Sequence, residues 1–382
     1  MRSEDKVKAA IVGCGAISEI YLSNLAGPQR KFQVIDVVAC CDMRVEAAQA
    51  KAEKYGLKVM TLDEVCNDSE IELVINLTTP GAHYPVIKQL LMAGKHVYTE
   101  KILAIHLHEA QELVALAAEK NLYLGVAPDT FLGSSVQTAR QIVDAGLIGE
   151  VTSCYAALNR DYNLMPEHVP FVSKLGGGIG FDVGIYYVTA LLSILGPVQS
   201  VCGFMKTNRP DRKHFLPARD NFGEEYHVES ENLMVGSLMF ESGIVGTLHF
   251  NSESIMNEKA QLVIYGTEGI LYMGNPDQFG GDVKLLRKGQ TEPVVIPANH
   301  GYGDNCRGLG VAEMAWAMKE GRKNRANKEM ALNALETLHG IAISSETKKH
   351  YELESTFEIQ PALPQGFLGG EYYGCNSEAS LI

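Results

Sequence analysis

The stretch Val7-Lys8-Ala9-Ala10-Ile11-Val12-Gly13-Cys14-Gly15-Ala16-Ile17-Ser18 decides the fold of the first half of the chain. An apolar run, 7–12, is followed by Gly-x-Gly-x-x-Ser and then by helical apolar spacing over 16–25. The first glycine permits a tight turn, the second lets a phosphate approach the backbone, and the third position needs only a small residue. The stretch therefore predicts a strand, a phosphate-binding turn and a helix whose first amides, from Gly15, Ala16 and Ile17, point at a pyrophosphate.

The same alternation of apolar runs and helical patterns continues to about residue 126. Further strands are expected at 34–41, 73–77, 96–99 and 122–126, and further helices at 45–55, 83–93 and 108–120. Such alternation is typical of a parallel sheet with helices on both faces. We therefore predict an α/β N-terminal domain, a doubly wound parallel Rossmann sheet, over residues 1–127.

The pattern changes in the second half of the chain. A helix at 136–145 leads to strands that are joined by turn signals such as Glu241-Ser242-Gly243, which indicates a largely antiparallel sheet. The strands are expected from 151 onward and at 198–204, 233–240, 244–251, 260–265, 270–273 and 283–287; the helices at 181–195, 310–320 and 328–348. The polar segment 207–229 is predicted to be an excursion or lid. Residues 128–382 are thus predicted to form an α+β domain with a large, mostly antiparallel sheet.

Composition narrows the class of protein. A length of 382 residues suits two domains, and 46% hydrophobic with 21% charged residues is typical of a soluble globular chain. The net charge of −13 argues against nucleic acid and favours a neutral substrate. No apolar run is long enough for a membrane helix, and the N-terminus lacks a secretory signal. The eight cysteines include no Cys-x-x-Cys pair, and no histidines pair as His-x-x-x-His, so we expect reduced thiols, no metal and a cytoplasmic location.

Asp42 strengthens the dinucleotide prediction. It ends the second expected strand, where a carboxylate accepts hydrogen bonds from both adenosine ribose hydroxyls. A carboxylate there also repels a 2′-phosphate, which favours NAD over NADP. Arg44 lies two residues further on and leaves NADP open as the alternative.

Several motifs then occur in an order that resembles one family. The chain has Thr79-Pro80 with His83, then Gly94-Lys95-His96-Val97, Glu100-Lys101-Ile102, Ala145–Val151, Gly176–Tyr186 and Gly266-Thr267-Glu268-Gly269. Together they resemble the Gfo/Idh/MocA family of NAD(P)-dependent oxidoreductases, and the resemblance covers most of the chain. One position departs from the family pattern, because Ile102 stands where the family has proline. Without proline a cis peptide is costly, so the geometry around Lys101 is the point to check.

The resemblance implies a site around Lys101, which follows the expected strand at 96–99 at the edge of the sheet where ligands gather. Lys101 is expected to contact both the nicotinamide ribose and the substrate hydroxyl. Tyr186, four residues after Asp182 on one helix face, is a proton carrier or a wall of the pocket, and Asp182 is expected to orient the substrate hydroxyls or the lysine. His168 is the alternative proton carrier, so the predicted catalytic residues are Lys101, Tyr186, Asp182 and His168. The predicted cofactor-binding residues are Gly13, Gly15, Ala16, Ile17, Asp42, Arg44, Thr78, Thr79, Pro80, His83, Glu100 and Lys101. The predicted substrate-binding residues are Lys101, Asp129, Arg160, His168, Asp182 and Tyr186, with Asp161 and Tyr162 as further candidates.

Three functions are compatible with these residues. The first is an NAD-dependent dehydrogenase or reductase of a sugar, glycoside or cyclitol, in one form oxidising C3 of a glycoside. The second is a hydrolase or lyase of glycosides in which NAD is a recycled redox cofactor. The third is a non-catalytic NAD-binding regulator. The resemblance also implies self-association through the open sheet face, as a homodimer or homotetramer.

Overall fold

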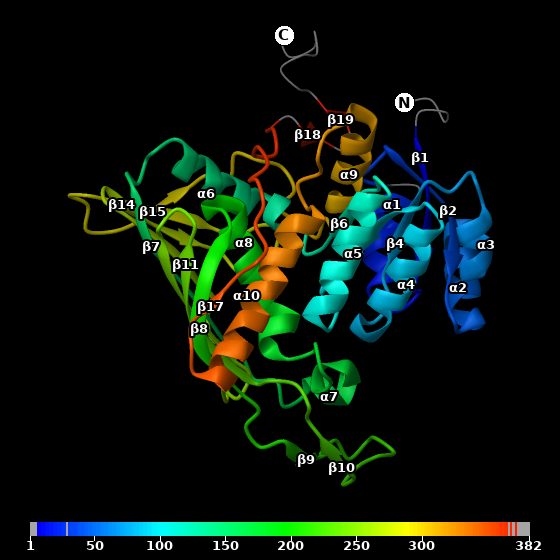
Figure 1. Cartoon of the computed structure of the whole chain (residues 1–382), viewed down its shortest axis with the longest axis horizontal. Coiled ribbons are helices and arrows are strands. Elements are labelled where there is room, and N and C mark those ends of the chain that lie inside the picture. The colour runs from blue at the N-terminus through cyan, green and yellow to red at the C-terminus, as the bar shows by residue number, and fades with distance from the viewer. Residues whose placement is uncertain (1–5, 28–29, 366, 369–370, 373–382) are drawn as a thin grey trace.

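The computed structural model describes residues 6–27, 30–365, 367–368 and 371–372. Figure 1 shows two sheets side by side, a parallel one near the N-terminus and a larger one beyond it, with helices between them. Cys375, one of the eight cysteines, lies outside the described residues. No helix in the described part of the chain is long and apolar enough to cross a membrane.

The first sheet has six strands, all parallel, in the order β3-β2-β1-β4-β5-β6. Their bounds are β1 Val7–Val12, β2 Ile35–Cys41, β3 Lys58–Val59, β4 Leu73–Asn76, β5 His96–Thr99 and β6 Leu124–Val126. Strands β1, β4 and β5 are almost entirely buried, because helices cover both faces of the sheet. The predicted Rossmann fold is confirmed.

Five helices flank this sheet: α1 Ser18–Leu25, α2 Val45–Tyr55, α3 Leu62–Asn67, α4 Pro80–Met92 and α5 Leu107–Glu119. Neither β3 nor α3 was predicted. Strand β3 has only two residues and both are exposed, so no apolar run marks it. Helix α3 begins with a capping box between Thr61 and Glu64, which is the signal that was overlooked.

The second sheet has nine strands in the order β16-β15-β14-β13-β7-β12-β11-β8-β17. Their bounds are β7 Val151–Asn159, β8 Val198–Lys206, β11 Leu233–Phe240, β12 Val245–Asn251, β13 Gln261–Gly266, β14 Gly269–Met273, β15 Val283–Arg287, β16 Val294–Ile296 and β17 Tyr351–Glu352. Within the described sheet, neighbours pair antiparallel except for β7 and β12, which are parallel. The sheet is therefore mixed and mostly antiparallel, as predicted.

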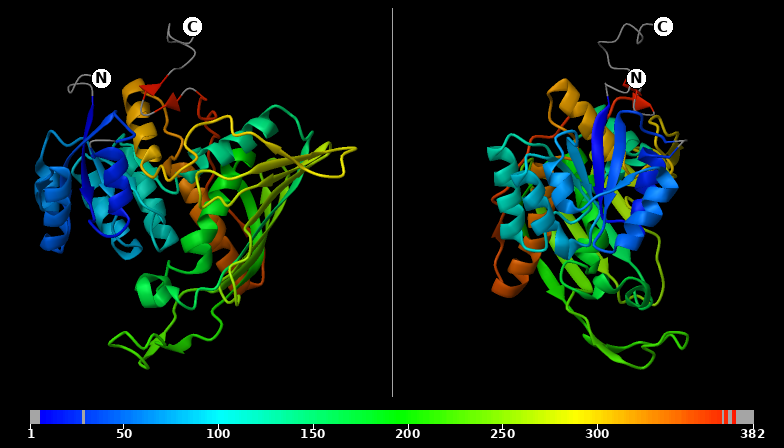
Figure 2. Two further views of the ribbon diagram at one scale, coloured as in Figure 1. Left: turned by 180° about the vertical axis from the view of Figure 1, so that it is seen from behind. Right: turned by 90° about the vertical axis from the view of Figure 1, so that its right-hand side faces the viewer.

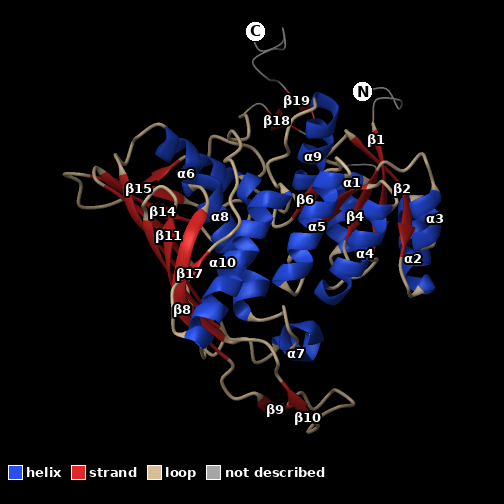
Figure 3. Cartoon of the chain, viewed as in Figure 1, coloured by secondary structure: helices blue, strands red, loops and turns tan. Residues whose placement is uncertain are grey.

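Helices cover one face of the large sheet (Figure 3). Helices α6 Ser134–Asp144, α8 Ile185–Leu195 and α10 Lys328–Thr347 pack between this sheet and the first domain. The opposite face carries no helix among the described elements, as the left-hand view of Figure 2 shows. Two short strands, β9 Asp211–Lys213 and β10 Glu225–His227, form a hairpin that projects from the body within the predicted excursion; β18 Phe367–Leu368 and β19 Glu371–Tyr372 form a second small hairpin.

The two halves are joined at the edge strand β6. Helix α10 packs against α5 and β6, and α9 Leu309–Glu320 packs against β6. The Val126 amide donates to the Ala326 carbonyl over 3.0 Å, and Gly125 forms an isolated bridge with Asn327. This joint holds the carboxyl end of β5 close to the segment that leads into α8.

Candidate active site

The phosphate-binding turn lies between β1 and α1. Gly13 has φ +99°, and a Cβ at this position would lie 2.6 Å from the Leu77 carbonyl carbon, so only glycine fits. The Ser18 amide and hydroxyl both donate to the Gly15 carbonyl, which closes the first turn. A Cβ built on Gly15 would meet nothing within 4 Å, so the space outside the turn is open. The predicted turn residues therefore form a cradle that fits a pyrophosphate.

Asp42 lies beside this turn at the end of β2. Its Oδ2 accepts the Cys14 amide over 2.7 Å and its Oδ1 accepts the Arg44 amide over 2.8 Å. Each bond occupies one lone pair, and a carboxylate has about four acceptor sites, so Asp42 retains the capacity to bind ribose hydroxyls. The Arg44 side chain is 73% exposed, with Nε 3.7 Å from Asp42 Oδ1. These contacts place both predicted residues beside the turn, where the adenosine ribose is expected to bind.

The predicted Thr78–His83 segment starts helix α4 beside the turn. Thr79 precedes the helix and Pro80 is its first residue, a position where the missing amide proton costs nothing. His83 is buried, and its Nδ1 and Nε2 lie 2.5 Å from the Ile102 carbonyl and 3.0 Å from the Thr78 carbonyl. Burial lowers the pKa of His83. The structure thus gives His83 a positioning contact, in which it ties the α4 entrance to the segment after Lys101.

Lys101 follows β5 at the carboxyl edge of the parallel sheet. The Lys101–Ile102 peptide is cis, although residue 102 is not proline. The neighbouring Glu100 accepts the Tyr21 hydroxyl over 2.8 Å and the Lys101 amide over 3.0 Å. These contacts fix the backbone on which the lysine side chain depends.

The Lys101 ammonium crosses to the second domain. Its Nζ donates to Asp182 Oδ1 over 2.5 Å and to the Asp182 carbonyl over 2.7 Å. Burial lowers the pKa of Lys101, but the Asp182 charge, with smaller effects from Tyr186 and Glu100, raises it more, so the pKa ends well above its ordinary value. Lys101 is therefore a fixed positive charge at neutral pH.

Two tyrosines complete this cluster. The Tyr162 hydroxyl donates to Asp182 Oδ2 over 2.9 Å, so both Asp182 oxygens are held. The Lys101 Nζ lies 5.5 Å from the centre of the Tyr186 ring. Burial raises the pKa of Tyr186 to about 12, although the Lys101 charge opposes this shift. The structure thus brings together Lys101, Asp182 and Tyr186, three of the four predicted catalytic residues.

Glu231, which the sequence prediction missed, shapes the segment that carries Asp182. Its Oε1 accepts the Gly180 amide over 2.8 Å and contacts the Phe181 amide at 3.4 Å. A Cβ on Gly178 would lie 2.0 Å from a Glu231 oxygen, so glycine is required where the chain bends round this carboxylate. Residues 180–184 form a π-helical turn that continues into α8. Burial raises the pKa of Glu231 to about 7.

A second polar group lies next to the Lys101 cluster. Arg160, at the end of β7, donates to Asp277 over 3.2 Å, and Arg307, just before α9, approaches the same carboxylate at 3.6 Å. Arg160 was predicted as a substrate contact, but Asp277 and Arg307 were not. No motif marks them, because the loop after β14 and the entrance of α9 converge only in the folded chain.

Asp129 and His168 lie outside this cluster's hydrogen bonds. Asp129 is buried, and its Oδ2 accepts the Gly308 and Gly310 amides at the start of α9, over 3.0 and 2.9 Å. Burial raises its pKa to about 6. His168, at the end of α7 Met165–His168, is exposed, and its Nδ1 lies 2.9 Å from an Arg219 nitrogen of the projecting excursion. The other candidate, Asp161, is also exposed and accepts Asn163.

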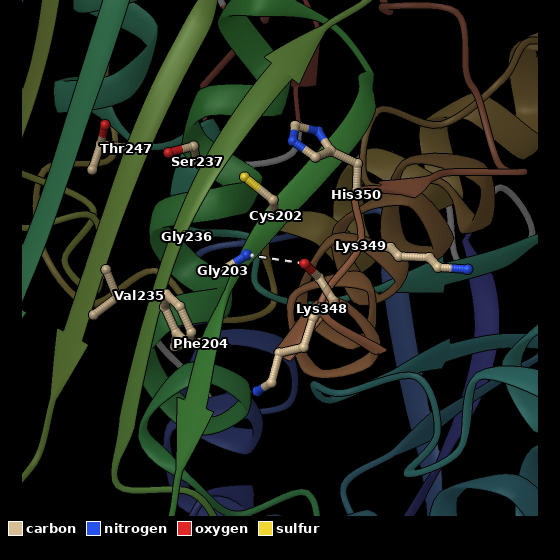
Figure 4. A pocket seen from close by; sticks show the side chains of 11 residues that line it. Cys202, Gly203, Phe204, Val235, Gly236, Ser237, Thr247, Lys348, Lys349 and His350 are labelled. Carbon is tan, nitrogen blue, oxygen red and sulfur yellow. Dashed lines mark hydrogen bonds between the residues drawn. The ribbon is translucent and has the colours of Figure 1, made fainter. Parts of the chain in front are cut away.

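A separate groove lies on the open face of the large sheet (Figure 4). It is lined by β8, β11 and β12 together with residues 344–350, and the Gly203 amide donates to Ser344 Oγ at its floor. The side chains of Phe204 and Val235 give it an apolar wall, and Lys348 and His350 lie at its rim. None of the Lys101 cluster lines this groove.

The fold and the Lys101 site together define the class: an oxidoreductase with an NAD-binding Rossmann domain. Comparison with known families agrees. Residues 7–127 match a model described as "Oxidoreductase family, NAD-binding Rossmann fold", and residues 136–272 match the "GFO/IDH/MocA C-terminal domain". The chain belongs to the Gfo/Idh/MocA family of NAD(P)-binding oxidoreductases.

Individual relatives are similar to this chain at low sequence identity. An uncharacterized oxidoreductase of Schizosaccharomyces pombe is 31% identical over 53% of this chain and 55% of its own length, so the match spans about half of that relative. The scyllo-inositol 2-dehydrogenase (NADP(+)) IolW of Bacillus subtilis is 24% identical over 92% of this chain and 98% of its own. The solved structure of levoglucosan dehydrogenase in complex with NADH has a TM-score of 0.76 at 17% identity, covering 91% of this chain and 99% of that one; it shows the shared fold.

Proposed function

We propose that the protein transfers a hydride between NAD and a hydroxyl-bearing carbon of a sugar, glycoside or cyclitol. The observation that carries the proposal is the Lys101 ammonium, held by Asp182 at the carboxyl edge of β5 beside Tyr186. Ligands of open α/β sheets bind at this edge, and a fixed cation there stabilises the oxygen of a substrate as it loses its proton. The Bacillus subtilis relative is named as a dehydrogenase of scyllo-inositol, a cyclitol, which supports the substrate class.

Each residue of the cluster has a distinct part in this proposal. The nicotinamide of NAD, when bound, takes up the hydride. The positive charge of Lys101 stabilises the developing alkoxide, and Asp182 fixes the ammonium through Oδ1 while Tyr162 holds Oδ2. The Tyr186 ring lies under the Lys101 ammonium, and its phenol would exchange the hydroxyl proton with a substrate bound against both side chains.

We also propose NAD rather than NADP as the cofactor. The turn residues and Asp42 would hold the dinucleotide, and the Asp42 carboxylate, fixed by the Cys14 amide, would repel a 2′-phosphate. Titration with NAD and NADP tests this directly. We expect NAD to bind more tightly, and the variant Asp42→Ser to lose that preference; tighter NADP binding by the unaltered protein would contradict the assignment.

The experiment that tests the function is turnover on a panel of sugars, methyl glycosides and inositols, with NADH formation measured by absorbance and the oxidised carbon located by NMR. Oxidation of a glycoside at C3 is the form we favour, in a cytoplasmic enzyme. NADH formation that disappears in Lys101→Met supports the proposal. Release of the aglycone without net NADH would replace it with a cleavage in which NAD is recycled, and NAD binding without any turnover would replace it with a regulator.

The open sheet face supports a further proposal, self-association as a homodimer or homotetramer. Phe204 on β8 is 61% exposed, and Met239 and Val245, which are register partners on β11 and β12, are also exposed. Phe204 pairs with Val235, which lies four residues before Met239, so these exposed apolar side chains share one face of the sheet at two places along the strands. Exposed apolar surface of this kind is what subunit interfaces cover.

A further inference from the structure

We propose that the substrate carries a carboxylate, which the paired guanidinium groups of Arg160 and Arg307 bind beside the Lys101 cluster. This proposal rests on the proposed function, because it names the substrate class of the same site. It departs from the expectation of a neutral substrate, which was based on the net charge of the whole chain. At the site itself, by contrast, two positively charged guanidinium groups share one carboxylate.

The two arginines come from distant parts of the chain and share one carboxylate. Asp277 accepts Arg160 through Oδ2 over 3.2 Å, whereas Arg307 lies 3.6 Å from Oδ1, beyond a good hydrogen bond. The side chains of Arg160, Arg307 and Asp277 are 22%, 17% and 22% exposed, so the group is recessed but reachable. Asp277 therefore positions both guanidinium groups without occupying all their donors.

This group adjoins the reacting residues. Arg160 stands two residues before Tyr162, the tyrosine that holds Asp182. Burial raises the pKa of Tyr162, and the Arg160 charge partly opposes that shift. Burial lowers the pKa of Arg307, but Tyr186 raises it more through its charge and a hydrogen bond, so Arg307 stays fully charged next to the proposed proton carrier. A substrate bound against Lys101 and Tyr186 would thus extend toward the two arginines.

The N–H groups of Arg160 and Arg307 indicate the chemical class of the ligand. Each guanidinium has five N–H groups; in the described structure Arg160 donates to Asp277, and Arg307 donates to the Asn305 side chain and is hydrogen-bonded to Tyr186, which leaves further donors on both arginines. The charges of two buried carboxylates, Glu100 and Asp129, also act on Arg307, but each is already engaged. Glu100 accepts Tyr21 and the Lys101 amide, and Asp129 accepts two amides of α9. A substrate carboxylate matches the remaining planar donors, because it accepts two parallel N–H bonds.

Calorimetric binding to the NADH-loaded protein tests the proposal without relying on turnover. The probes are glucuronic acid and galacturonic acid. Each is compared with its methyl ester, which keeps the shape of the sugar and removes the negative charge. We expect at least one acid to bind about tenfold or more tightly than its neutral counterpart. Arg307→Gln and Arg160→Gln should each remove most of that preference, and Arg307→Lys should not restore it.

The matched control is Arg287→Gln, an exposed arginine on β15, which should keep the full preference. Equal binding of acid and neutral partner in every pair, or no binding of any acid, overturns the proposal. So does an acid preference that survives both Arg160→Gln and Arg307→Gln. The proposed function fails separately: acid binding without NADH formation would leave this inference standing and remove hydride transfer, whereas turnover of neutral sugars alone would do the reverse.

Discussion

At the scale of single residues, the protonation states of Lys101 and Tyr186 decide how the site handles a proton. The pKa of Lys101 lies well above its ordinary value because Asp182 is so close, and burial raises the pKa of Tyr186 to about 12. Both groups are therefore protonated at neutral pH. They are ready to donate a proton during reduction, but one of them must first lose a proton to act as a base during oxidation.

The pH dependence of the two directions should differ for this reason. Below its pKa of about 12, the ionised fraction of Tyr186 rises about tenfold per pH unit, so we expect kcat for oxidation to rise through the alkaline range. The reverse reduction uses the protonated phenol and should stay level over the same range. Rate profiles for wild type and Tyr186→Phe check this. The Phe variant should be slower by about 10²-fold or more, and an unchanged alkaline rise in that variant would remove Tyr186 from the proton path.

Some residues of the site could be predicted from the sequence, and others could not. Lys101, Asp182, Tyr186 and Asp42 were predictable because each stands in a short motif or at a strand end. Asp277, Arg307 and Glu231 stand in no motif. Glu231 contacts amides about 50 residues away in the chain, and Asp277 contacts Arg160 and Arg307 from distant segments. Asp129 was expected near the substrate because it follows β6, but its strand-end carboxylate accepts the α9 amides instead.

At the scale of elements, replacing either of two nearby glycines in the β1–α1 turn should affect the protein differently. In Gly13→Ala the added Cβ would meet the Leu77 backbone at 2.6 Å and φ is +99°, so we expect unfolding to become easier by about 1–3 kcal/mol. In Gly15→Ala the Cβ meets no protein atom within 4 Å and enters only the open space where we propose that the pyrophosphate binds. Thermal unfolding and NAD titration check the pair.

We expect Gly15→Ala to keep the Tm of the free protein and to weaken NAD binding by about tenfold or more. Gly13→Ala should lower the Tm even without NAD. Normal NAD affinity in Gly15→Ala would contradict the assignment of this turn to the pyrophosphate.

The glycine-rich segment before α8 depends on Glu231 in a pH-dependent way. Burial raises the pKa of Glu231 from 4.5 to about 7, so the folded protein holds this proton more tightly than the unfolded chain does. Its contribution to stability is full below about pH 4.5 and is lost as the pH rises through 7, a change on the order of 3 kcal/mol. Glu231→Gln should remove that slope from the free energy of unfolding.

Denaturant titrations between about pH 4.5 and pH 8 measure this slope. The matched control is Glu119→Gln, an exposed glutamate at the end of α5, which should leave the slope of the wild type in place. A Glu231→Gln slope equal to that of the wild type would mean that this carboxylate is already ionised throughout the range.

Some helices and strands can be predicted from the sequence more accurately than others. Strands β1, β5, β11 and β15 were predicted to the residue, because their apolar runs are bounded by turn or charge signals. Strands β16 and β17 were missed because they are short edge strands with exposed residues. The π-helical turn at 180–184 was read as part of α8, since it has helical spacing and its irregularity comes from the contact with Glu231.

At the scale of the whole molecule, one sheet face remains uncovered while the other packs against helices (Figure 3). If subunits associate through the uncovered face, Phe204→Asp should shift the protein to a monomer, because a charge would have to be buried in the interface. Light scattering measures the mass, which for one chain is 41.7 kDa. The control Phe222→Asp, on the projecting excursion, should retain the oligomer. A monomeric wild type would contradict the proposed assembly.

The central claim is that the joint between the two domains forms a hydride-transfer site around Lys101. It is tested most directly by giving wild type, Lys101→Met and the exposed-site control Lys58→Met the same deuterated polyol substrates with NAD, and analysing the cofactor by mass spectrometry. We predict deuterium in the NADH formed by wild type and Lys58→Met, and none with Lys101→Met, although that variant still folds and binds NAD. Substrate conversion without deuterium in the NADH, or undiminished transfer by Lys101→Met, would contradict the claim.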